Sequence, residues 1–426
     1  MIIELISLFL VFVILISLSL LIFKSVVAPI GLYAFIWSGV FTTAILFEYD
    51  YRFSPNMYYA FTLSWACFTF GCLFFKLIYY FRTRGKYKTV RVEIIDSSRL
   101  REVMVYLSLS GLLFSVIYIY EMFNLLSLIE LQNIRGYIYA ESADVGSRVI
   151  TRHWYIYNVG LAVICLGAII GSIYIARSKD QKNYYKVCSI TPIISVFLFS
   201  IAEMSRGRIM DVMTIYILVI LLVQYKGSII NFIKDKYQFI FILLSTLLYI
   251  SSLITAARGV DLKEGMVSNL FANVGNYVLV SVVAFNESLT GNTHMGLRAI
   301  IYPLFYLLEK VGLISVGGYP DPTKLTSLIA YPTPTYLFWL FNGYGFISIM
   351  AVPFIVGLIS SYLFSRFRIY GGIKYLMFYV ISCILIIFSV MTWRLFDLWY
   401  CILIISVIPI SNYIVIRRNI KEEAPH

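Results

Sequence analysis

Apolar stretches long enough to cross a lipid bilayer recur along the whole chain and constrain its fold more than any other feature. A helical span takes about 20 apolar residues, because each residue adds about 1.5 Å and the hydrocarbon core is about 30 Å thick. Of the 426 residues, 60% are apolar and 13% are charged, which leaves no room for a sizeable soluble domain. We therefore predict an all-α, polytopic integral membrane protein, with residues 1–426 in a single membrane domain. The eleven predicted spans are at residues 3–23, 28–47, 57–80, 103–123, 154–176, 187–204, 209–225, 239–257, 344–365, 375–393 and 398–416.

The basic residues predict how these spans are oriented. The loop 82–101 holds seven Lys and Arg, the densest basic cluster in the chain, and such loops lie in the cytoplasm. By alternation, and counting Lys24 and a snorkelling Lys76, this side takes 22 basic and 7 acidic residues, and the opposite side takes 12 and 15. The N-terminus is then periplasmic and the C-terminus cytoplasmic. The surplus of 12 positive charges therefore reflects topology, and we expect no nucleic acid partner. The other predicted cytoplasmic segments are 177–186, 226–236, 366–374 and 417–421.

Tryptophans lie near the external ends of several predicted spans. Trp and Tyr are enriched at membrane interfaces, where their amphipathic rings sit at headgroup level. The sequence therefore predicts an external aromatic belt made of Trp154, Trp339, Trp393 and Trp399.

Two predicted external segments, 124–153 and 258–343, are long, and the second is too long to be a plain connection. The second contains two apolar helical patterns, at 275–284 with its flanks and at 297–312. If both patterns cross the bilayer, the number of spans rises from 11 to 13. Charged residues flank or interrupt both patterns, so we favour short helices in a large external loop that caps the bundle.

Arginine dominates the basic residues of the external side. Its planar guanidinium binds phosphate or carboxylate through two parallel hydrogen bonds and keeps its charge in dry surroundings. Arg206 and Arg208 flank Gly207 at the start of a predicted span, where exposed amides and the helix dipole also favour an anion. In the alternative interpretation, Glu203 and Asp211 pair with these arginines. The two roles can coexist.

Further arginines lie at other external helix ends. Arg258 ends the eighth predicted span, and Arg394 lies in the short turn before the eleventh. A helix bundle could gather them with Arg206 and Arg208 around one anion-binding cavity. The candidates for contacts to an acceptor substrate, which could equally be solvated loop residues, are Arg135, Arg148 and Arg152.

Four external residues could accept a proton near neutral pH, namely His294, Glu287, Asp321 and His153. His294 lies in a flexible polar break between the two helical patterns of the large loop, and it and Glu287 are the preferred candidates. The acidic pair Glu48 and Asp50 provides too few ligands for a metal ion, so we expect no metal site.

In these features the chain resembles the bacterial O-antigen polymerases, also called oligosaccharide repeat-unit polymerases. The resemblance covers the whole-chain architecture with its two external loops. The turn Ser205-Arg206-Gly207 that opens a span is similar to the family pattern. So is the stretch from Thr333-Pro-Thr-Tyr336 through Asn342-Gly343-Tyr344-Gly345 into the ninth span.

The resemblance implies glycosyl transfer, without metal or cofactor, at the periplasmic face of the bacterial inner (cytoplasmic) membrane. A glycan on undecaprenyl diphosphate would pass to a hydroxyl of the next lipid-linked repeat unit. The implied partners are this undecaprenyl-diphosphate-linked oligosaccharide and membrane lipid, and a chain-length regulator protein is a further candidate. We expect the following roles: Arg206 and Arg258 on the donor diphosphate, Arg208 and Arg394 in support, and His294 or Glu287 activating the acceptor.

Two alternative functions share some of these features. An O-antigen ligase has the same architecture and donor but transfers whole chains to a lipid A core. A flippase or exporter of lipid-linked oligosaccharide would instead have short loops, and the 86-residue segment 258–343 argues against it.

Overall fold

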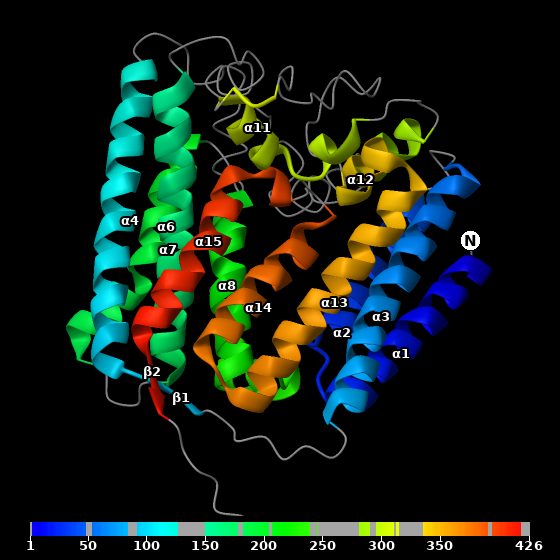
Figure 1. Cartoon of the computed structure of the whole chain (residues 1–426), viewed down its shortest axis with the longest axis horizontal. Helices are drawn as coiled ribbons and strands as arrows, with labels where there is room; N and C mark the ends of the chain where they lie inside the picture. Colours follow the sequence, from blue (N-terminus) through cyan, green and yellow to red (C-terminus); the bar gives the residue numbers. More distant parts are fainter. Residues whose placement is uncertain are drawn as a thin grey trace, which may run out of the picture.

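The computed structural model shows a bundle of helices with short helices at one end and a small β-ladder at the other (Figure 1). Apart from the ladder, the fold is helical throughout the described part of the chain, as predicted. The structure describes residues 2–47, 53–83, 92–126, 150–177, 182–203, 207–238, 245, 281–289, 295–310, 312–314, 335–390 and 394–418.

Seven of the described helices are long and apolar enough to cross a membrane, and by length and composition they make a polytopic membrane protein. They are α1 (Ile2–Phe23), α2 (Pro29–Phe47), α3 (Pro55–Thr83), α4 (Ser97–Leu126), α6 (Ile150–Arg177), α7 (Asn183–Glu203) and α13 (Phe346–Tyr370). Three shorter apolar helices complete the bundle: α8 (Gly207–Val223), α14 (Ile373–Phe388) and α15 (Leu398–Ile414). Ten of the eleven predicted spans thus coincide with helices. The eighth, at 239–257, lies outside the described residues except for Ser245.

The outer surface of the bundle is apolar, as expected for helices in contact with lipid. On α1, large side chains such as Phe9, Ile14 and Leu21 are exposed, the last by 77%. A soluble protein rarely leaves an apolar surface of this extent uncovered. The pattern therefore agrees with the membrane assignment made from the sequence.

Within the bundle, α3 and α13 cross closely at glycines. A methyl group on Gly71 would lie 2.1 Å from the carbonyl oxygen of Phe354, and one on Gly357 would lie 2.3 Å from that of Phe68. Small residues at such crossings let two backbones approach, which is a main source of helix association in membranes. The long helices thereby form a tightly packed frame for the two ends of the bundle.

One end of the bundle, here called the basic end, gathers segments that the sequence analysis placed together in the cytoplasm. Arg99, at the start of α4, donates from Nη1 to the carbonyl oxygen of Tyr413 at 3.1 Å. Arg368, near the end of α13, donates to the carbonyl oxygen of Lys226 at 2.8 Å. Basic segments far apart in sequence therefore meet at one end.

A two-stranded antiparallel ladder, which the sequence did not predict, lies at the basic end of the otherwise helical fold. Strand β1 (Val92–Ile95) pairs with β2 (Val415–Arg418), with Val92 opposite Arg418 and Ile95 opposite Val415. Both segments are rich in β-branched residues, which favour extended backbone. β2 directly follows α15, so the ladder ties the last helix to the segment before α4 (Figure 1).

The opposite end carries short helices from the predicted large loop: helical residues 281–288, η1 (Gly296–Ala299), α11 (Tyr302–Lys310) and α12 (Tyr336–Tyr344). α11 has nine residues, or about 14 Å, which is less than half the thickness of the hydrocarbon core. Each described helix of the pattern at 297–312 is therefore too short by itself to cross the membrane, which favours the predicted capping loop. The earlier pattern, at 275–284, is described only from residue 281.

α12 is anchored to the long helices by buried polar contacts at its start. Thr335 caps the helix by accepting a hydrogen bond from the Phe338 amide, and the Tyr336 phenol contacts the hydroxyls of Tyr33 and Ser64. Burial raises the pKa of the Tyr336 phenol well above its ordinary value, so the hydroxyl stays protonated. This network connects the end of the bundle that bears the short helices to α2 and α3.

Candidate functional site

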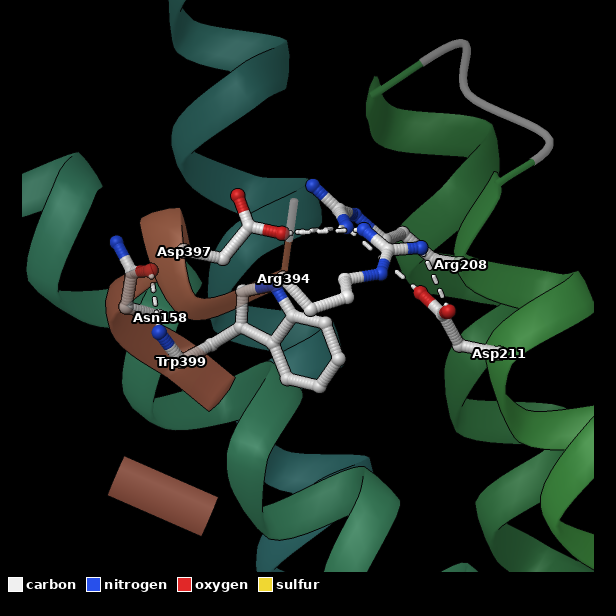
Figure 2. Close-up of polar contacts among 6 residues, drawn as sticks. All are labelled: Asn158, Arg208, Asp211, Arg394, Asp397 and Trp399. Atoms are coloured by element: carbon white, nitrogen blue, oxygen red, sulfur yellow. Dashed lines mark hydrogen bonds and ion pairs between the residues drawn. The ribbon is translucent and has the colours of Figure 1, made fainter. Parts of the chain in front are cut away.

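Arg208 and Arg394, two of the four arginines predicted to converge, lie beside each other in the structure (Figure 2). Arg208 belongs to the first turn of α8, which begins at Gly207 as the sequence predicted. Arg394 opens the 3-10 turn η3 (Arg394–Phe396) between α14 and α15, and α11 packs against this turn. The two arginines therefore lie at the end of the bundle that bears the short helices (Figure 1).

Two aspartates bridge the guanidinium groups, and the four residues Arg208, Asp211, Arg394 and Asp397 are called the Arg–Asp cluster below. Arg394 makes the short contacts, from Nη2 to Asp211 Oδ1 at 2.7 Å and from Nη1 to Asp397 Oδ2 at 3.1 Å. Arg208 Nη1 is 3.7 Å from Asp211 Oδ2 and 4.0 Å from Asp397 Oδ2. Both aspartates thus contact both arginines.

Local helical geometry explains half of these pairs. Arg208 and Asp211 are three residues apart on α8, and Arg394 and Asp397 are three residues apart in and after η3. This spacing places the two side chains on the same face of a helical turn. The remaining pairs arise because α8 and η3 are brought together by the fold.

Burial differs sharply between the two aspartates. The Asp211 side chain is 0% exposed and the Asp397 side chain is 25% exposed, while the Arg394 and Arg208 side chains are 6% and 15% exposed. Charges removed from water need opposite charges and hydrogen bonds to be tolerated. The cluster meets this need with two positive and two negative groups. Asp211 forms its inner side and Asp397 its water-facing side.

Aromatic rings surround the two guanidinium groups. The Trp399 ring lies 5.5 Å from the Arg394 guanidinium and 5.7 Å from that of Arg208. Phe388 lies 4.7 Å from Arg394, and Tyr157 lies 5.5 Å from Arg208. Ring faces attract cations and exclude water, which strengthens electrostatic interactions within the cluster.

The position of Trp399 corrects the predicted aromatic belt. Trp399 and Trp339 are both buried inside the protein and do not face lipid. The Trp399 amide donates to Asn158 Oδ1 at 3.0 Å, so a polar side chain from α6 fixes the start of α15 (Figure 2). Sequence reasoning missed Asn158, although a lone asparagine inside an apolar run was a usable signal.

The alternative interpretation of the first arginine motif is confirmed for one pair, because Asp211 binds Arg208. Its other members, Arg206 and the side chain of Glu203, lie outside the described residues. Asp211 lies closer to Arg394, at 2.7 Å, than to Arg208 on its own helix, at 3.7 Å. The residue is therefore a bridge between two elements and not only a local partner.

The other predicted site residues are placed as follows. Glu287 is half-buried on the helical segment 281–288. The adjacent Asn286 accepts hydrogen bonds from the amide and hydroxyl of Ser54 at 2.8 Å, which ties this segment to the start of α3. The candidates outside the described residues are Glu48, Asp50, Arg135, Arg148, Arg206, Arg258, His294 and Asp321, together with the side chains of Arg152 and His153. Within the described part of the chain, no group of three or more His, Cys, Asp and Glu could hold a metal ion.

Comparisons with protein-family models, with curated proteins and with solved structures gave no match to this chain. The resemblance to O-antigen polymerases stays a prediction from the sequence. The functional conclusion therefore rests on the chemistry of the site itself.

Proposed function

We propose that this protein polymerises lipid-linked oligosaccharide repeat units, such as those of O-antigen, by glycosyl transfer from an undecaprenyl-diphosphate-linked glycan. The observation that carries the proposal is the meeting of Arg208 and Arg394 at one end of a membrane helix bundle, beneath short capping helices. A diphosphate on a polyprenyl lipid would reach such a site at the depth of the lipid headgroups.

The proposed orientation places the basic end in the cytoplasm and the Arg–Asp cluster at the periplasmic face of the inner membrane, with eleven spans. It is supported by the positive-inside rule and by the gathering of basic segments at one end. Repeat units made in the cytoplasm would be joined after they had crossed the membrane.

The chemistry of the reaction fits a cluster of arginines. When the glycosidic bond to the donor breaks, negative charge develops on the departing diphosphate, and fixed cations stabilise it without having to reorganise. Guanidinium groups suit this role because each can bind two phosphate oxygens at once. We assign this role to Arg208 and Arg394, joined by Arg206 and Arg258. His294 or Glu287 would accept the proton of the attacking hydroxyl, and Arg135, Arg148 and Arg152 would bind the acceptor.

Single substitutions Arg394→Gln and Arg208→Gln test the proposal in cells whose surface glycan depends on this protein. Glutamine keeps much of the side-chain length but removes the charge. We expect both variants to shift the surface glycan on a gel from long chains to single repeat units attached to the core. The matched control is Arg366→Gln, because Arg366 also lies against two rings, at 5.3 Å from Tyr362 and 5.1 Å from Tyr370, but outside the cluster.

Other glycan patterns would indicate a different function. Free lipid-linked polymer in the arginine variants would indicate a ligase, and loss of all external glycan would indicate a flippase or exporter. Full-length chains from both variants at normal expression would refute the assignment of the site.

A further inference from the structure

Asp397 lies where an incoming anion would have to bind. Its Oδ2 atom is 3.1 Å from Arg394 Nη1 and 4.0 Å from Arg208 Nη1, so one carboxylate oxygen faces both guanidinium groups. A phosphate oxygen that bound both arginines would take the same position, because carboxylate and phosphate oxygens satisfy guanidinium donors with the same geometry. A ligand and Asp397 therefore compete for the arginines.

From this geometry we infer that Asp397 is a displaceable counter-ion, which neutralises the cluster until a diphosphate replaces it and which selects diphosphate over monophosphate. The identity of the ligand rests on the proposed function. The displacement itself rests on three features of the described residues.

The first feature is the unequal burial of the two aspartates. Asp211 is fully buried and 2.7 Å from Arg394, whereas Asp397 is 25% exposed and makes the longer contacts. Removing a buried partner leaves an uncompensated charge, while a partly exposed pair contributes little net free energy. Asp397 can turn towards water, and Asp211 cannot.

The second feature is the start of α15, which the Asp397 carboxylate could approach but does not contact. Asp397 is the N-cap residue of α15, yet its side chain makes no capping hydrogen bond. Aspartate at this position normally accepts a hydrogen bond from an amide of the first helical turn, and the helix dipole favours its charge there. Asn158 already accepts from the Trp399 amide, so the displaced carboxylate would be stabilised at the start of α15 mainly by the helix dipole.

Asp96 at the basic end shows the ordinary behaviour in the same chain. It precedes α4, its side chain is 23% exposed, and it pairs with Arg99, three residues ahead, at 3.4 Å. Asp96 nevertheless also caps its helix, accepting from the Ser98 amide at 2.9 Å. Asp397 has similar exposure and lies three residues after an arginine instead of three before one, and its side chain contacts the guanidinium groups without capping α15.

The third feature is a set of buried donors that lack acceptors. Within the described part of the chain, the indole nitrogen of Trp399 and Nε of Arg394 have no hydrogen-bond partner. Trp399 is 1% exposed, and Figure 2 shows its ring beside the Arg394 side chain. An unpaired buried donor is costly. Asp211 Oδ2 also lacks a hydrogen bond and meets Arg208 only as an ion pair at 3.7 Å, so the two carboxylates do not satisfy these donors. A ligand with several oxygens would satisfy them.

The second phosphate group of the ligand then explains the selectivity. With Asp397 in place the four residues of the cluster are neutral. A monophosphate carries about 1.5 to 2 negative charges at neutral pH, so what sets a diphosphate apart is its second phosphate group, which lets it bind both guanidinium groups at once. A diphosphate brings further negative charge and further oxygens, and so outcompetes Asp397. The counter-ion thereby protects the site from monophosphates while admitting diphosphates.

The test measures binding of undecaprenyl diphosphate and undecaprenyl monophosphate to the purified full-length protein in detergent. Asp397→Asn removes the charge but keeps a good N-cap residue. We expect this variant to bind the monophosphate about fivefold more tightly than the wild type does, as removal of a weak ion-pair competitor allows, and to lose part of its preference for diphosphate. Asp96→Asn is the control and should bind both lipids as the wild type does.

The outcomes separate the two proposals. If the wild type and Asp397→Asn bind both lipids with the same affinities and the same preference, the role of Asp397 is refuted and the proposed function stands. Should neither protein bind either lipid, the ligand class is wrong, and the proposed function and the counter-ion role both fall. Weaker binding by a folded Asp397→Asn would show that Asp397 supports the site, which also contradicts the inference.

Discussion

The two ends of the helix bundle use arginine in different ways. At the basic end, arginines lie near the surface and bind backbone carbonyls, as Arg99 does with its side chain 44% exposed. At the opposite end, Arg394 is 6% exposed and bound to two carboxylates. The comparison teaches that the number of basic residues reports the orientation of a membrane chain, whereas their burial and their acidic partners identify a site.

The largest expected effect is the all-or-none signal of a topology reporter. Because the basic end is expected in the cytoplasm, a green fluorescent protein fused after β2 should fluoresce and alkaline phosphatase fused there should be inactive. The same reporters inserted at Leu313, an exposed residue beyond α11, should give the reverse pattern. Fluorescence from both positions would disprove the proposed orientation.

The next largest effect should follow Asp211→Asn. This change leaves two buried guanidinium groups with a single, partly exposed carboxylate, so we expect the free energy of unfolding to fall by about 3–5 kcal/mol. Asp96→Asn at the basic end should cost less than about 1 kcal/mol, because its ion pair is exposed to water. Denaturant unfolding in detergent micelles measures both. Equal free energies of unfolding for Asp211→Asn and Asp96→Asn would show that the two ends do not differ in the energetic role of their ion pairs.

A smaller contrast is expected for two tyrosine hydroxyls. Tyr336→Phe removes the buried contacts that hold α12 to Tyr33 and Ser64, and should lower the free energy of unfolding by about 1–2 kcal/mol. Tyr413→Phe removes an exposed hydrogen bond to Glu102 at 3.0 Å and should change stability by less than about 0.5 kcal/mol. The same unfolding measurement compares them. A larger loss for Tyr413→Phe would mean that the capping helix is not anchored as described.

The sequence was sufficient for the parts of the fold that depend on local composition. Apolar runs located ten helices correctly, because burial in lipid demands uniform hydrophobicity over a fixed length. Charge alternation correctly grouped the basic segments at one end. For the same reason, the placement of Arg208 and Arg394 at helix ends on one side could be predicted.

Features that depend on long-range packing could not be predicted. β1 and β2 are four-residue strands from distant parts of the chain, and nothing in the sequence of either segment indicates which segment it pairs with. Hydropathy placed Trp399 at the lipid interface, whereas the fold buries it against Arg394. The alternative interpretation paired Asp211 with an arginine of its own motif, but its closest contact, to Arg394, depends on the packing of η3 near α8.

The most direct test of the account is a cryo-electron microscopy structure of the full-length protein with undecaprenyl diphosphate. We predict phosphate oxygens within hydrogen-bonding distance of Arg208 and Arg394, with Asp211 still bound to Arg394 and the Asp397 carboxylate turned to the start of α15. A diphosphate bound elsewhere, with all four residues of the Arg–Asp cluster paired as they are now, would contradict the central claim that these two arginines form the anion site.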